Sequence, residues 1–142
     1  MDEILTRTIS LRCGIDHAFD VFTTMTDLWW PRGHHKFSDG TLHLDARPDG
    51  ALVDRGPDGT EWTMAVVRAV EPPALLVLDW YPGSPGSPTS VEIRFSESAG
   101  DTQIVVTHRP LPDSRSIWSQ RVALFDRGWS AVLESIKVYV DD

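Results

Sequence analysis

Tryptophan is the residue type in this 142-residue chain that points most directly to a chemical task. The six tryptophans are Trp29, Trp30, Trp62, Trp80, Trp118 and Trp129. A buried indole removes about 150–250 Å² from water, so these residues serve either as core or as walls of a pocket for a flat, apolar ligand. Trp62 and Trp80 fall on inward faces of predicted strands, and Trp129 lies on the apolar face of a predicted helix. We expect these three indoles to meet in the interior.

The tandem Trp29 and Trp30 stand immediately before Pro31 and a polar segment from 33 to 40 that we interpret as a loop. This placement predicts a position at the mouth of a cavity. If both indoles were exposed, they would instead favour a surface that contacts another protein.

His108 is the first candidate for a polar contact inside the protein. It alternates in phase with Ile104 and Val106, and side chains two apart on a strand point to the same face. We therefore expect it to point inward. Two roles remain open for it, a hydrogen-bonded structural histidine or the single polar group that fixes a ligand in an apolar pocket.

His34 and His35 are adjacent on the predicted loop, where they invite a metal or acid–base interpretation. His43, with Asp39 or Asp45, could join them, but no Cys, Asp or Glu lies at the spacing of a known metal site. We expect exposed loop polarity or a polar rim to the pocket, and no metal.

Other catalytic signatures are missing from the sequence. It has no GxSxG nucleophile motif, and it has no GxGxxG or Walker loop that would hold a nucleotide. Cys13 is the single cysteine and has no evident catalytic partner. We assign no catalytic residue and no cofactor, and a protein that is not an enzyme is the favoured interpretation.

The composition narrows the class of protein. The chain is of single-domain length, so we expect one domain over 1–142. A net charge of −8 with scattered basic residues argues against nucleic acid. No apolar run approaches the roughly 20 residues of a membrane span, and the N-terminus does not resemble a signal peptide. We expect a cytoplasmic protein with no membrane partner.

A long helix near the C-terminus must position Trp129 and Phe125. Apolar residues recur there at spacings of three and four, which places them on one helical face. They are Val122, Phe125, Trp129, Val132, Leu133, Ile136 and Val140. We predict a helix from about Ile117 to Val140, roughly 36 Å long at 1.5 Å per residue, with Asp113 or Ser114 as its cap.

Most of the chain before that helix has the alternation of β-strands. The predicted strands are Ile4–Arg12, Thr41–Ala46, Ala51–Arg55, Thr60–Val70, Leu75–Tyr81 and two more that carry Val91, Ile93, Phe95 and Ile104, Val106, His108. In Thr60–Val70, Trp62, Met64 and Val66 should share a face. In the first strand, Arg7 should point inward and need a carboxylate or a ligand anion as partner.

Two connections complete the prediction. A short helix follows the first strand, with Asp16 as N-cap and Ala18, Val21, Phe22 and Met25 as its apolar side. The segment 82–88, rich in Pro, Gly and Ser, is predicted to be irregular.

Several local strings, in this order, resemble the family of activator-of-heat-shock-protein-90-ATPase homologues within the START-like (SRPBCC) helix-grip superfamily. The strings are Leu28-Trp29-Trp30-Pro31, Arg47-Pro48-Asp49-Gly50, Pro57-Asp58-Gly59, Val70-Glu71-Pro72-Pro73 with Leu76 and Trp80, Thr102–His108, and Gly128-Trp129. The resemblance covers nearly the whole chain. It implies an α+β fold in which a curved, seven-stranded antiparallel sheet wraps around one long C-terminal helix.

The resemblance also implies a hydrophobic cavity between helix and sheet. Three functions follow: a module that binds a hydrophobic or aromatic small molecule, a co-chaperone-like protein that acts on a heat-shock-protein-90-type ATPase, and a cyclase or hydratase that uses the same cavity. We favour the first, with a homodimer or a chaperone as further expected partners. The expected ligand-binding residues are Trp29, Trp30, Trp62, Trp80, His108, Phe125 and Trp129.

Overall fold

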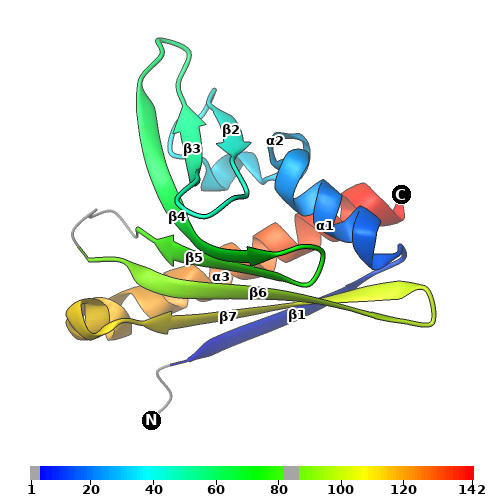
Figure 1. The fold of residues 1–142 in the computed structure, drawn as a ribbon. Helices are drawn as coiled ribbons and strands as arrows, with labels where there is room; N and C mark the ends of the chain where they lie inside the picture. Colours follow the sequence, from blue (N-terminus) through cyan, green and yellow to red (C-terminus); the bar gives the residue numbers. More distant parts are fainter. Residues whose placement is uncertain (1–3, 82–86) are drawn as a thin grey trace.

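A curved antiparallel sheet and one long helix dominate the computed structural model, which describes residues 4–81 and 87–142 (Figure 1). The strands of this described part are β1 Leu5–Leu11, β2 Thr41–Leu44, β3 Ala51–Arg55, β4 Glu61–Glu71, β5 Leu75–Trp80, β6 Thr89–Ser98 and β7 Asp101–Pro110. The helices are α1 Ile15–Thr24, α2 Thr26–Trp29 and α3 Arg115–Asp141, with single 3₁₀ turns at Arg32–His34 and Pro112–Ser114. The predicted α+β helix-grip class is confirmed.

The sheet has the order β1-β7-β6-β5-β4-β3-β2, and every neighbouring pair is antiparallel. Strands β2 to β7 follow one another as a meander, whereas β1 pairs with β7, the last strand in the chain. The inward pairs between β6 and β7 are Val91–His108, Ile93–Val106 and Phe95–Ile104. All six of these side chains are buried, as their alternation predicts.

The alternation predicted for β4 is wrong at Val66. Leu52 of β3 pairs with Ala65 while Val53 pairs with Thr63, so Met64 is an extra residue on β4. Such a bulge shifts the phase of the strand and bends it. Met64 and Ala65 are therefore both buried, and Val67 takes the core position expected for Val66. The bent β4 carries β2 and β3 toward the helices (Figure 1).

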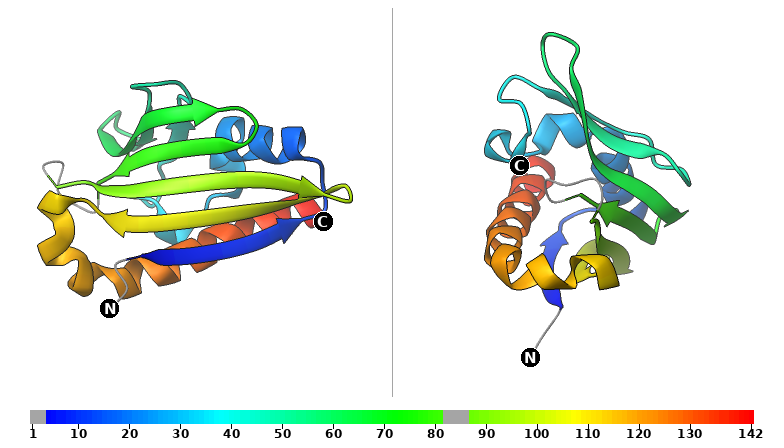
Figure 2. Two further views of the ribbon diagram at one scale, coloured as in Figure 1. Left: turned by 60° about the horizontal axis from the view of Figure 1, so that its bottom comes forward. Right: turned by 90° about the vertical axis from the view of Figure 1, so that its left-hand side faces the viewer.

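Helix α3 spans 27 residues, about 40 Å at 1.5 Å per residue, and lies on the concave side of the sheet beside β1 (Figure 2). Five residues of the predicted stripe are buried and two are partly buried. The buried ones are Phe125, Trp129, Val132, Leu133 and Ile136, and the partly buried ones are Val122 and Val140. Ser114 occupies the N-cap position, but its side chain bonds Leu111 instead of capping α3.

Three polar contacts join α3 to β1 and the residue after it. Arg7 forms an ion pair with Asp126, so it has a carboxylate partner, but its side chain is 40% exposed and is not the buried cation that was expected. The Nζ atom of Lys137 donates to the carbonyl of Ser10 at 2.9 Å, and the Arg12 N–H donates to Asp141 at 2.9 Å.

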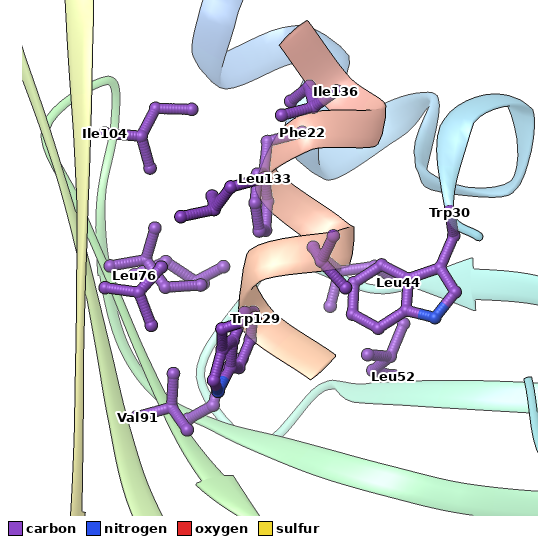
Figure 3. Packing of buried hydrophobic residues seen from close by; sticks show 14 of the residues in the cluster. Phe22, Trp30, Leu44, Leu52, Leu76, Val91, Ile104, Trp129, Leu133 and Ile136 are labelled. Carbon is purple, nitrogen blue, oxygen red and sulfur yellow. The ribbon is translucent and has the colours of Figure 1, made fainter. Parts of the chain in front are cut away.

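Helix α1 buries Ala18, Val21 and Phe22 as expected, but its N-cap is Gly14 and not Asp16. The ring of Phe22 lies 5.7 Å from Phe95 of β6, so α1 closes one end of the core. Figure 3 shows this core between α3 and the sheet.

Two other expectations concern the chain as a whole. Most of the predicted irregular segment 82–88 lies outside the described residues. Within the described part of the chain, no helix is long and apolar enough to cross a membrane.

Candidate functional site

A hollow of about 190 Å³ lies between α3 and the bent part of the sheet, and we call it the inner hollow. Its lining comes from α3, from β4 and β5, and from the segment after α2. The lining residues are Trp30, His34, Met64, Trp80, Leu124, Phe125, Gly128, Trp129 and Val132. Eight of the nine carry no ionisable group, so the space suits an apolar ligand.

Three indoles form the walls of the inner hollow. The ring centroids of Trp30 and Trp80 lie 6.3 Å apart in a stacked arrangement, and those of Trp80 and Trp129 lie 5.2 Å apart. Trp30 and Trp129 meet edge to face at 6.3 Å. The expected meeting of Trp80 with Trp129 is confirmed, but Trp30 takes the place expected for Trp62. Figure 3 shows Trp129 reaching from α3 toward the sheet, while Trp30 comes from the segment after α2.

His108 holds one of these walls in place. The indole Nε1 of Trp129 donates to His108 Nδ1 at 2.9 Å. Because Nδ1 accepts, the ring proton of a neutral imidazole is on Nε2, which lies 2.6 Å from the Thr89 hydroxyl. That hydroxyl in turn donates to the carbonyl of Trp80 at 3.3 Å. The chain of hydrogen bonds thus connects two walls of the inner hollow.

The structural role of His108 uses both ring nitrogens. Its side chain is fully buried and does not line the inner hollow. Phe125 covers it at 4.3 Å and Trp118 at 5.3 Å between ring centroids. Burial lowers the pKa of His108 from 6.5 to about 3, so the imidazole is neutral at pH 7. The geometry favours the structural alternative over direct ligand contact.

Trp29 and Trp62 lie outside the inner hollow. Trp29 is buried, contrary to its expected place at a cavity mouth, and its Nε1 donates to the carbonyl of Val21 at 2.9 Å. The ring centroids of Trp29 and Trp30 lie 5.7 Å apart, so Trp29 packs against a lining residue of the inner hollow without lining the hollow itself. Trp62 is partly exposed, and the ammonium of Lys36 lies 4.4 Å from the centroid of its ring.

An outer hollow of about 340 Å³ adjoins the inner one. It is lined by His34, His35, Lys36, Trp62, Met64, Trp80, Tyr81 and Leu124. Four of these residues, His34, Met64, Trp80 and Leu124, line both hollows. A ligand could therefore extend from the three indoles to the polar residues of the outer hollow.

The segment that bears His34 and His35 is anchored to the sheet by Asp54 of β3. Asp54 Oδ2 accepts the backbone N–H groups of Lys36 and Phe37 at 2.6 and 3.1 Å. Its Oδ1 lies 3.5 Å from His35 Nδ1, and among the described residues neither atom has a hydrogen-bond partner. The His35 side chain is fully buried, which corrects its expected exposure on a loop. His34 is partly exposed and forms the polar rim that was expected.

A family model described as Activator of Hsp90 ATPase homolog 1-like protein matches residues 12–141. The chain belongs to this family. A search of curated protein sequences gives no match to the chain.

Solved structures with this fold agree with the family assignment. Ms6760 from Mycobacterium smegmatis aligns with a TM-score of 0.70 and 17% identity, over 97% of this chain and 90% of that one. The Aha1 dimer from Colwellia psychrerythraea aligns at 0.70 and 14%, over 97% and 96%. DynU16, from the dynemicin biosynthetic locus, aligns at 0.71 and 18%, over 98% of this chain and 47% of the longer DynU16 chain. At these identities the likeness shows the fold alone.

Several lining residues of this family member were not anticipated from the sequence. Met64 was expected to share the inward face of Trp62, but its place in the site was not inferred, because alternation gives the face of a strand and not the residues that meet across the core. Gly128 did leave a signal, because glycine inside a helix costs about 1 kcal/mol relative to alanine. A Cβ on Gly128 would lie 3.8 Å from His34 Nδ1, so the glycine leaves room above the rim. Asp54 lines neither hollow but anchors the segment that bears His34, and it also left a signal, since it alternates in phase with the buried Leu52.

The ionisable side chains of the two hollows form no metal centre. Over residues 4–81 and 87–142, no group of three or more His, Cys, Asp or Glu side chains is placed to hold an ion. What the site can do chemically is enclose a flat apolar molecule and offer polar groups at one end.

Proposed function

We propose that this protein binds a hydrophobic, aromatic small molecule in the inner hollow between α3 and the sheet. The observation that carries the proposal is the cluster of three mutually contacting indoles, Trp30, Trp80 and Trp129, that lines an apolar hollow. Because centroid separations of 5.2–6.3 Å are contact distances, a planar ligand would stack on the faces and edges that these indoles turn toward the hollow, not between them.

The volume sets the size of the ligand. An engineered apolar cavity of about 150 Å³ takes up benzene. The inner hollow, at about 190 Å³, therefore suits a group of roughly one or two rings. Larger ligands would extend through the residues shared with the outer hollow.

The alternative functions have less support. Acid–base catalysis by His108 would require a free ring nitrogen, and both are occupied by Trp129 and Thr89. Among the histidines considered for catalysis, His34 is the one that lines the inner hollow. The argument for a chaperone-binding surface depended on exposed Trp29 and Trp30, and both are buried.

Self-association is part of the proposal, because a related structure is described as an Aha1 dimer. Light scattering on the purified protein tests it. A mass that stays at the 15.9 kDa of one chain across the concentration range would exclude the homodimer.

The binding proposal is tested by thermal unfolding in the presence of a library of one- and two-ring aromatic compounds. A compound at 100 times its Kd stabilises the folded protein by about 2.7 kcal/mol, which raises Tm by roughly 5–10 °C in a domain of this size. Filling the hollow should abolish the shift. Gly128→Leu should fill the inner hollow while leaving its aromatic walls in place. It should not weaken α3, because leucine is a better helix former than glycine.

Ser130→Leu is the matched control, because Ser130 is an exposed position two residues further along the same helix. We expect this variant to keep the ligand-induced shift. A library without a stabilising compound, or a shift that persists in Gly128→Leu, would contradict binding in the inner hollow.

A further inference from the structure

We propose that the ligand is an aromatic anion, such as an aromatic carboxylate, whose ring occupies the inner hollow while its acidic group lies against Lys36 in the outer hollow. This inference rests on the proposed function and adds the chemical class of the ligand. It assigns to Lys36 the role of recognising negative charge.

The two hollows are continuous and differ in polarity, so together they favour a ligand with one apolar end and one polar end. His34, Met64 and Trp80 line both spaces, so a molecule stacked among the indoles can project past them into the outer hollow. The inner end offers almost no polar partner. The outer end carries the Lys36 ammonium and the Tyr81 hydroxyl, both of which can donate hydrogen bonds. An amphiphilic ligand therefore has one orientation that satisfies both ends.

The charge of the outer hollow is opposite to that of the molecule. The chain carries 21 Asp and Glu residues and a net charge of −8. Among the described residues that line the outer hollow, none is acidic, while Lys36 is one of only two lysines in the sequence. A cationic spot on an acidic protein favours an anion over a neutral or cationic ligand of the same shape.

Local contacts hold Lys36 in place but leave its charge available. Its backbone N–H is fixed by Asp54, and its ammonium lies 4.4 Å from the centroid of the Trp62 ring. A ring face attracts a cation without using up its hydrogen-bond donors. Across the described part of the chain, no carboxylate lies within ion-pair distance of the Lys36 ammonium. Asp54 itself accepts hydrogen bonds from the backbone N–H groups of Lys36 and Phe37.

A matched pair of probes tests the inference. 2-Naphthoate and 2-naphthamide share the same two rings and differ in charge, and isothermal titration calorimetry measures both affinities at pH 7. We expect 2-naphthoate to bind about fivefold more tightly, near the upper end of what an exposed ion pair contributes. Lys36→Met should lower its affinity to that of 2-naphthamide and leave 2-naphthamide unchanged, because methionine keeps an unbranched, apolar stem without the charge.

Two controls separate charge from structure. Lys36→Arg should retain the preference for 2-naphthoate, and Lys137→Met should retain it as well, because Lys137 pairs with Asp141 on α3. Equal affinity for both probes in the wild type, or a preference that survives Lys36→Met, would overturn the inference while leaving the proposed function intact. If neither probe binds, the inference fails and the library decides the proposed function; if Gly128→Leu binds both probes as well as the wild type, the proposed function fails too.

Discussion

His108 shows how one buried side chain can position the walls of the inner hollow without lining it. Its imidazole accepts from Trp129 and faces the Thr89 hydroxyl, which reaches the carbonyl of Trp80. Both indoles line the inner hollow, so their relative placement depends on a neutral imidazole between them. Protonation would replace the acceptor at Nδ1 with a donor that faces the indole N–H, and two donors cannot bond each other.

This arrangement predicts an acid-sensitive fold. The pKa of His108 is about 3 in the folded protein and about 6.5 in the unfolded chain, so the unfolded state binds the extra proton between these values. Stability is therefore lost as the pH falls below 6.5. For this one group we expect a loss of roughly 2.5 kcal/mol between pH 7 and pH 4.5, measured as the change in unfolding free energy by urea denaturation at each pH.

The variant His108→Gln isolates this contribution, because glutamine does not titrate in that range. It is less stable than the wild type at pH 7, but its further decline to pH 4.5 should be smaller by roughly 2.5 kcal/mol. His43→Gln, at an exposed position on β2, should decline as the wild type does. An equal decline in His108→Gln and wild type would show that His108 is not held neutral by burial.

The sequence predicted the direction of His108 but not the burial of His35. The inward direction of His108 followed from its phase with Ile104 and Val106, because period two is strict on a regular strand. The burial of His35 could not be inferred in this way, because a loop has no period. The burial of His35 depends on Asp54 of β3. The Asp54 carboxylate accepts hydrogen bonds from the backbone N–H groups of Lys36 and Phe37, which follow His35, and so holds the loop against β3.

At the scale of elements, prediction succeeded wherever pairing is regular. The β6–β7 pair runs without a shift over ten residue pairs, and its inward side chains are those that alternation assigns. Strand β4 departs from its predicted pattern because it bulges at Met64, and a bulge depends on the partner strand as well as on local sequence. Met64, the extra residue of the bulge, lines the inner hollow and keeps the inward direction that alternation predicts, whereas the departures lie at Ala65, Val66 and Val67.

Helix α3 was the most predictable element, and one residue, Gly128, departs from its pattern of good helix formers. Its stripe at spacings of three and four is long enough to determine the buried face with little ambiguity. The exception is Gly128, a poor helix former next to Trp129, and a Cβ at this position would contact His34, which lines the inner hollow with it. The resemblance to a known family supplied the general place of the cavity. The cation beside it became apparent only when Lys36, Trp62 and Trp80 were seen to line one space.

At the scale of the whole molecule, the first strand, β1, and the last helix, α3, pack against each other and so join the two ends of the chain. Strand β1 lies at the edge of the sheet beside β7, the last strand in the chain, and α3 lies against β1 (Figure 2). The contacts from Lys137 to Ser10 and from Asp141 to Arg12 join positions more than 120 residues apart. By contrast, β2 has four residues and pairs within the sheet only with β3.

This closure predicts that β1 and the second half of α3 open as one unit. Buried Ile136 and Leu133 pack beneath the sheet, so neither element can leave without exposing the core of the other. Native-state hydrogen exchange at increasing urea should give the amides of β1 and of residues 129–137 the same opening free energy, equal to that of global unfolding. The amides of β2 should exchange through a smaller opening. If β1 exchanged at lower free energy than β2, the two ends of the chain would not be closing the fold together.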